Sequence, residues 1–113
     1  MVMDNICCLL GNFIRCSAYK NIIFCWVMHE QSIIDDILSR LDLGACEVCA
    51  VSLVASPDAL TERLTHDVRA GIREPDVIAR SLARLPLYEK LQTVKLDVSK
   101  LSPQETAEMI AAL

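Results

Sequence analysis

Five arginines and one histidine are concentrated in residues 60–88, LTERLTHDVRAGIREPDVIARSLARLPLY, of a chain whose formal net charge is −4. An arginine guanidinium holds phosphate well because its planar fork presents several donors in a fixed geometry. Such a cluster in an acidic chain therefore indicates a stretch that faces phosphate. The alternative is a pair of solvated surface helices with ordinary charge pairs, and the residue pattern does not choose between them. The residues concerned are Arg63, His66, Arg69, Arg73, Arg80 and Arg84.

The spacing of three of these arginines bears on the phosphate hypothesis. Arg80 and Arg84 are four residues apart, so on a helix they would share a face and repel each other. A break in the helical pattern before Arg73 would bring that residue near them. An anion between the side chains would relieve the repulsion, and neutralisation by Asp67 and Asp76 would do the same.

The six cysteines include one Cys-x-x-Cys pair, Cys46 and Cys49. A structural zinc site needs four ligands, and no second pair lies at a suitable spacing. The pair also enters an expected strand, where residues three apart point to opposite faces. We therefore expect no metal site and interpret these cysteines as small buried apolar residues. The same interpretation covers Cys7, Cys8, Cys16 and Cys25.

Polar residues follow two of the expected strands at their carboxyl ends, where open α/β sheets bind their ligands. His29 and Glu30 are candidates for contact with a substrate, although the first polar turn of the next helix is the preferred interpretation. The segment Asp97-Val98-Ser99 leads into a helix N-terminus. Its backbone groups could hold the polar edge of a ligand.

Three short apolar runs predict the strands that would position these residues. Residues 22–27 (IIFCWV) and 48–54 (VCAVSLV) are continuous and predict strands buried on both faces, whereas residues 93–98 alternate. Apolar periodicity and capping residues predict helices between and around them. These helices are expected over residues 3–16 and 30–41, from Ser56 as the N-cap, from Pro75 to Pro86, and from Ser102 to the end of the sequence. Ser102 and Glu105 are expected to form a capping box at the start of the last helix.

The order of these elements predicts an α/β fold with a small parallel three-stranded sheet and flanking helices. At 113 residues the sequence has room for one domain, residues 1–113. The formal net charge of −4 argues against non-specific nucleic-acid binding. The longest apolar run, Ile22 to Met28, is far shorter than the ~20 residues that span a bilayer. No basic residue precedes the apolar N-terminal stretch, so we expect a cytoplasmic protein with reduced cysteines.

With these residues in view, the sequence resembles the C-terminal half of a P-loop small-molecule kinase. The resemblance is to the AAA-type, kinase-like branch near the gluconate, shikimate and adenylate kinases, and it covers about residues 5–113. It therefore implies a partial P-loop nucleoside-triphosphate-hydrolase-like fold. The segments that carry it are IIFCWVMHE, VCAVSLVASPDALTERL, DVRAGIREPDVIARSLARLPLY and TVKLDVSKLSPQE.

The resemblance implies ATP and Mg²⁺ as cofactors and a role for each candidate residue. Residues 60–88 would form a mobile lid over ATP. Arg63 would lie near the adenine, which the loop Asp97-Val98-Ser99 would border. His29 and Glu30 would lie on the acceptor side. Arg73, Arg80 and Arg84 would reach the phosphates and stabilise charge during transfer.

The sequence departs from this family at the phosphate loop. Phosphoryl transfer in this class depends on GxxxxGK[ST], and none of the three glycines belongs to such a motif. The family's first strand, phosphate loop and second strand are expected to be missing. Because that first strand is central in the family, its loss would leave strands 22–27 and 48–54 with unpaired apolar edges. We therefore expect a homo-oligomer, a swapped assembly, a complementing chain or a poorly soluble monomer, with no nucleic acid or membrane as partner.

Three functional hypotheses follow from the sequence. The first is an incomplete kinase-like nucleotide-binding half, with a family role in ATP-dependent phosphoryl transfer to a small molecule, inactive until a chain that carries the phosphate loop completes it. The second is a non-catalytic module for self-association or partner binding. The third is a truncated fragment.

Overall fold

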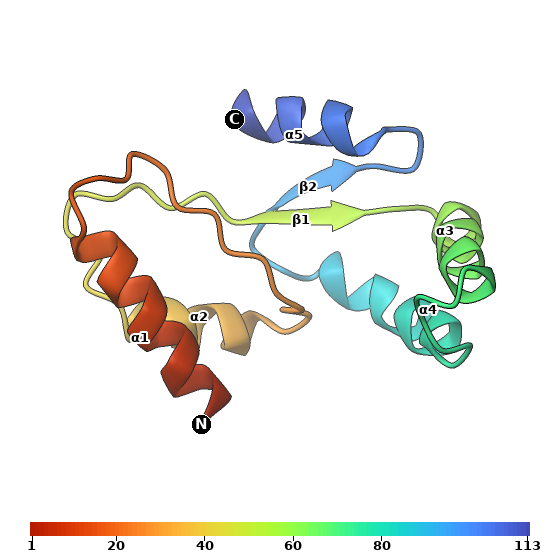
Figure 1. Ribbon diagram of the computed structural model, residues 1–113, viewed down its shortest axis with the longest axis horizontal. Coiled ribbons are helices and arrows are strands. Elements are labelled where there is room, and N and C mark those ends of the chain that lie inside the picture. Colours follow the sequence, from red (N-terminus) through yellow and green to blue (C-terminus); the bar gives the residue numbers. More distant parts are fainter. The chain divides into compact units, whose positions relative to one another are not determined.

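The computed structural model describes all 113 residues and has an α/β architecture of five helices and a two-stranded parallel sheet. The chain divides into two compact units, Met1–Val48 and Cys49–Leu113, and each is described by itself. Unit 1 contains α1 (Val2–Arg15) and α2 (Gln31–Ser39). Unit 2 contains β1 (Val51–Val54), α3 (Pro57–Arg69), α4 (Val77–Tyr88), β2 (Val94–Asp97) and α5 (Pro103–Ala111), as Figure 1 shows.

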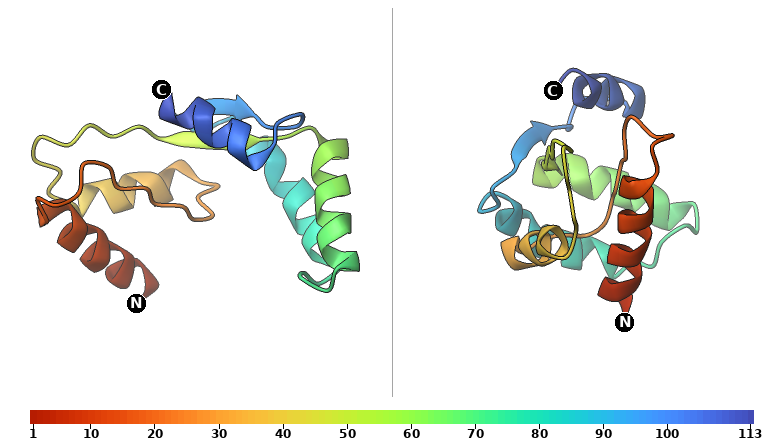
Figure 2. Two further views of the ribbon diagram at one scale, coloured as in Figure 1. Left: turned by 45° about the horizontal axis from the view of Figure 1, so that its top comes forward. Right: turned by 90° about the vertical axis from the view of Figure 1, so that its left-hand side faces the viewer.

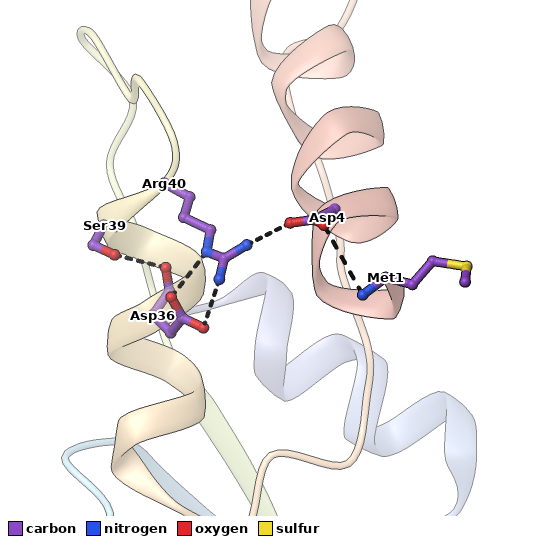
Figure 3. Close-up of polar contacts among 5 residues, drawn as sticks. All are labelled: Met1, Asp4, Asp36, Ser39 and Arg40. Carbon is purple, nitrogen blue, oxygen red and sulfur yellow. Dashed lines mark hydrogen bonds and ion pairs between the residues drawn. The ribbon is translucent and has the colours of Figure 1, made fainter.

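Arg40, directly after α2, connects the two helices of unit 1. Its Nε lies 2.9 Å from a carboxylate oxygen of Asp36, and its Nη1 lies 2.7 Å from a carboxylate oxygen of Asp4 on α1 (Figure 3). The hydrogen bond and charge of Asp36, followed by those of Asp4, raise the pKa of Arg40 above its ordinary value. All three side chains are solvent-exposed to a large degree, so this arrangement orients the helices more than it stabilises them.

The strand predicted for residues 22–27 is wrong, and so is the prediction of a three-stranded sheet. No regular secondary structure forms there, and no backbone group of residues 22–27 makes a backbone hydrogen bond. A strand exists only when its N–H and C=O groups pair with a neighbour, whatever its β propensity. The prediction of burial is also wrong, since the side chains of Ile23 and Trp26 are 89% and 41% exposed.

In unit 2, β1 and β2 pair in parallel, with Val51 opposite Val94 and Leu53 opposite Leu96. Figure 1 shows both strands running toward α3, and Figures 1 and 2 show α5 running back in the opposite direction. The pairing is shorter than predicted, and β1 is not buried on both faces because Leu53 is 51% exposed. The one buried hydroxyl of the sheet, Ser52, is satisfied by Thr93, whose Oγ1 lies 2.6 Å from the Ser52 Oγ.

Local capping residues account for the starts of α3 and α5. Ser56 accepts a hydrogen bond from the N–H of Ala59. Ser102 and Glu105 form the predicted capping box, in which the Ser102 Oγ accepts from the Glu105 N–H and the Glu105 carboxylate accepts from the Ser102 N–H. Pro86 does not end α4 as predicted, because the helix continues to Tyr88. A proline so close to the C-terminal end disturbs only the last turn.

The core is small. Seven apolar side chains are buried and none is completely inaccessible, while sixteen large apolar side chains are exposed. The prediction that the cysteines are buried is wrong, since five are exposed and Cys7 is half-buried. Five of the six lie in unit 1, which buries only Ile34 and Ile37 and offers them no core, and Cys49 lies just before β1. None of the five helices combines the length and apolar character that crossing a membrane would take.

The capping box of α5 generates a stability prediction. Replacing Ser102 with alanine should lower the free energy of unfolding by about 1 kcal/mol and fray α5, because the Glu105 N–H then loses its acceptor. Urea denaturation followed by far-ultraviolet circular dichroism measures the change. Ser32→Ala on α2 is the control, since the side chain of Ser32 is exposed and makes no hydrogen bond. Equal stability of the two variants would contradict the prediction.

Candidate functional site

The guanidinium of Arg63 on α3 holds the turn that connects β2 to α5. Its Nη2 donates to the backbone carbonyl oxygens of Val98, of Ser99 at 3.2 Å and of Leu101 at 3.3 Å. Because three carbonyl oxygens of the turn accept hydrogen bonds from this one cation, the shape of the turn depends on it. Arg63 therefore positions the turn, and the sequence, which predicted a contact with adenine for Arg63, did not indicate this role.

Asp97 and Ser99 tie the same turn to the N-terminus of α3. One Asp97 carboxylate oxygen accepts from the Ser99 N–H at 2.9 Å and from the Ser99 Oγ–H at 2.6 Å. The Ser99 Oγ in turn accepts from the Ser56 N–H at 2.8 Å. These two hydrogen bonds from Ser99 lower the pKa of Asp97, with smaller contributions from the charges of Lys100 and Arg63. The loops that follow β1 and β2 are thus joined by side chains.

A hollow of about 540 Å³ lies between α3 and this turn. Its volume is within the range of small-molecule sites. Cationic and anionic groups from α3 line it beside the hydroxyl of Ser99. The lining residues are Ala59, Glu62, Arg63, His66, Asp67 and Ser99.

A second hollow, of about 310 Å³, lies at the carboxyl ends of the strands. Val54 and Asp97, the last residues of β1 and β2, contribute to it together with Ser56, Pro86 and Glu89. Two carboxylates line this hollow and no basic side chain does, so it is unsuited to phosphate. Two of the three predicted adenine-side residues of the turn, Asp97 and Ser99, therefore line different hollows.

Apart from Arg63, the arginines of residues 60–88 fall into two classes. Arg73 pairs with Asp67, with 3.1 Å between Nε and the carboxylate, and Arg80 pairs with Asp76 at 3.5 Å. These pairs are the ordinary neutralisation considered as the alternative to phosphate. Arg84 is half-buried, and neither it nor the exposed Arg69 makes a hydrogen bond or an ion pair. Arg84 is thus the one predicted phosphate contact whose charge is not neutralised by a neighbour.

His29 and Glu30 lie in unit 1, directly before α2, and Glu30 is the N-cap residue of that helix. The His29 Nε2 is 3.9 Å from the Glu30 carboxylate, and the His29 Nδ1 is buried without a hydrogen-bond partner. This placement agrees with the preferred interpretation as the first polar turn of a helix. No group of three or more His, Cys, Asp or Glu side chains is arranged to hold a metal ion.

Sequence reasoning missed two residues of the site. Ser56 was predicted as an N-cap, but nothing indicated that its N–H would also bind Ser99. Lys100 was not considered, although its backbone N–H is the only one between Val98 and Leu101 that makes no hydrogen bond within the chain. Neither property depends on the identity of the side chain, so no sequence pattern could reveal it.

Comparisons with protein-family models, with curated proteins and with solved structures return no match to this chain. The kinase-like resemblance therefore stays a hypothesis that depends on the sequence segments quoted above.

The hydrogen bonds from Ser99 generate a prediction about pH. A depressed pKa means that the Asp97 carboxylate stabilises the folded state above the pKa it has when unfolded, and this stability is lost as the pH falls through the folded-state pKa. Ser99→Ala should raise the pKa of Asp97 toward its ordinary value. An NMR titration of the aspartate carboxyl carbons measures this. Ser32→Ala should leave Asp97 unchanged, and an unchanged Asp97 pKa in Ser99→Ala would contradict the assignment.

Proposed function

We propose that this chain is the adenine-side and lid half of a small-molecule kinase of the P-loop type, which binds ATP with Mg²⁺ weakly and is inactive alone. In this proposal a second polypeptide supplies GxxxxGK[ST], which the sequence does not contain. One observation carries the proposal: the turn Val98–Leu101, held by Arg63 beside the 540 Å³ hollow.

The turn offers the chemistry that an adenine edge needs. Arg63 and the sheet occupy most of its backbone groups and make it rigid, while the Lys100 N–H remains available as a donor. A rigid turn with an available N–H can hydrogen-bond a ring nitrogen of adenine without reorganising. In this proposal Arg63 acts as a positioning residue, and the Asp97-Val98-Ser99 segment borders the base.

Arg84 is the proposed phosphate contact on the lid side. A half-buried guanidinium without a carboxylate partner attracts an anion, and the fork geometry of arginine matches a phosphate group. Arg73 and Arg80 would have to exchange their aspartates for phosphate before they could contribute. His29 and Glu30 are the proposed contacts on the acceptor side.

A second candidate function is association with another chain, and the surface of the molecule supports it. Sixteen large apolar side chains are exposed against seven buried ones, which is a large exposed share for a chain of this size. A non-catalytic binding module requires only such a surface, and it would not require nucleotide at all.

An NMR titration of the amide signals of Ser99 and Lys100 with adenosine and with ATP·Mg²⁺ tests the first function. Both ligands should shift these signals, and ATP should bind more tightly than adenosine. Arg84→Ala should weaken ATP about tenfold, the size expected for one lost charge-assisted hydrogen bond, and leave adenosine unchanged.

Arg69→Ala is the matched control, because Arg69 is also an arginine without an ion pair and it lies on the exposed surface of α3. It should leave the affinity for both ligands within about twofold of the unaltered chain. Absence of any shift at Ser99 and Lys100 with millimolar nucleotide would contradict the proposed nucleotide site. Equal losses in Arg84→Ala and Arg69→Ala would contradict the role of Arg84.

A further inference from the structure

The two edges of the sheet differ in chemistry. The N–H groups of Val94 and Val98 donate to the carbonyls of Ala50 and Val54, so alternate residues of β1 face β2. Since the N–H and C=O of one strand residue point the same way, those of Val51 and Leu53 point away from β2. These four backbone groups form an edge that no other strand covers.

The outer edge of β2 carries charge, and that of β1 does not. The backbone groups of Lys95 and Asp97 point away from β1. Charged residues at such positions protect an edge strand against pairing with another chain. Residues 48–54 contain no charged residue, and the side chain of Leu53 is 51% exposed. The unprotected edge is therefore that of β1.

Residues 22–27 also lack a strand partner for their backbone groups, as the outer edge of β1 does. Residues 22–27, IIFCWV, are uncharged, and five of the six are β-branched or aromatic. They form no regular secondary structure and make no backbone hydrogen bond. Ile23 is 89% exposed. Such a segment has the composition of a strand and leaves its own N–H and C=O groups to water.

We propose that residues 22–27 of one copy pair with the outer edge of β1 of a second copy, and that the exchange is reciprocal. Each sheet then gains a third strand whose backbone groups satisfy those of Val51 and Leu53. A reciprocal exchange uses the same two surfaces on both copies, so it closes as a twofold dimer and leaves no open end for further growth.

This inference names the partner in the second proposed function, association, and it rests on that function rather than on the nucleotide site. The occupant is a second copy because the chain itself carries both halves of the interaction: an uncharged edge and an uncharged segment long enough to cover the four residues of β1. A partner of another sequence would need to supply a strand that this chain already has.

Three lysine substitutions test the proposal. Leu53→Lys charges the β1 edge, and Ile23→Lys charges the segment; both side chains are at least half exposed, so neither change removes core packing. Val94→Lys is the matched control, because Val94 is 44% exposed in the same sheet but lies on β2. Light scattering after size exclusion, under reducing conditions that keep the exposed cysteines unlinked, measures the molar mass.

The unaltered chain and Val94→Lys should have twice the chain mass of 12.6 kDa, whereas Leu53→Lys and Ile23→Lys should dissociate at least tenfold more readily. An equimolar mixture of the two dissociating variants should recover dimer. Leu53→Lys retains an intact segment and Ile23→Lys retains an intact edge, so one productive pairing forms between copies.

Several outcomes would overturn the proposal. A dimer that neither Leu53→Lys nor Ile23→Lys weakens would show association through another surface, and the second proposed function would survive without this inference. A chain that is monomeric at every concentration would overturn both. Failure of the mixture to recover dimer would exclude exchange between copies. Ile23→Lys controls for misfolding as the cause of dissociation in Leu53→Lys, because residue 23 lies outside every helix and strand.

Discussion

The parallel pairing of β1 with β2 is the contact on which the rest of residues 49–113 depends. It places the last residues of both strands at one edge, so the loops that follow them meet. There the Ser56 N–H donates a hydrogen bond to Ser99, and the Ser99 hydroxyl donates one to Asp97. Arg63 donates to the carbonyl oxygens of the turn. Without that register the N-terminus of α3 and the β2–α5 turn would not lie close enough to hydrogen-bond each other. The hollow beside them would then not form.

The same pairing limits the stability of the molecule. Parallel sheets are ordinarily covered on both faces and contain more than two strands, because each strand pair contributes little by itself. Here each strand has one open side, and the apolar residues Leu53 and Val94 are about half exposed. The small core and the uncovered β1 edge are therefore two consequences of one constraint. Association with a further strand would address both, whereas nucleotide binding would address neither.

Local features of the fold could be predicted from the sequence, and features that need a distant partner could not. The capping box of Ser102 and Glu105 and the N-cap of Ser56 were predicted correctly, because each depends on residues three positions apart. The strand at residues 22–27 was predicted wrongly, because β propensity says nothing about whether a neighbour is present. Only two of the expected strands form.

The candidate site shows the same division. The sequence identified the arginines as a cluster that could face phosphate and the Asp97-Val98-Ser99 segment as a polar feature at the end of a strand. It could not reveal that Arg63 would bind carbonyl oxygens 35 to 38 positions away, since backbone acceptors leave no trace in residue identity. It named Asp67 and Asp76 as possible partners of the arginines but did not choose between them and an anion, because that choice depends on side-chain placement.

Hydrogen exchange of the β1 amides at several protein concentrations tests most directly whether the sheet is completed by a second copy. The account predicts that the Val51 and Leu53 amides, which point away from β2, are protected in concentrated solution and lose protection on dilution. The Ser52 and Val54 amides, which point toward β2, should stay protected throughout. Rapid exchange of Val51 and Leu53 at every concentration would contradict the account, because the outer edge of β1 would then face only water.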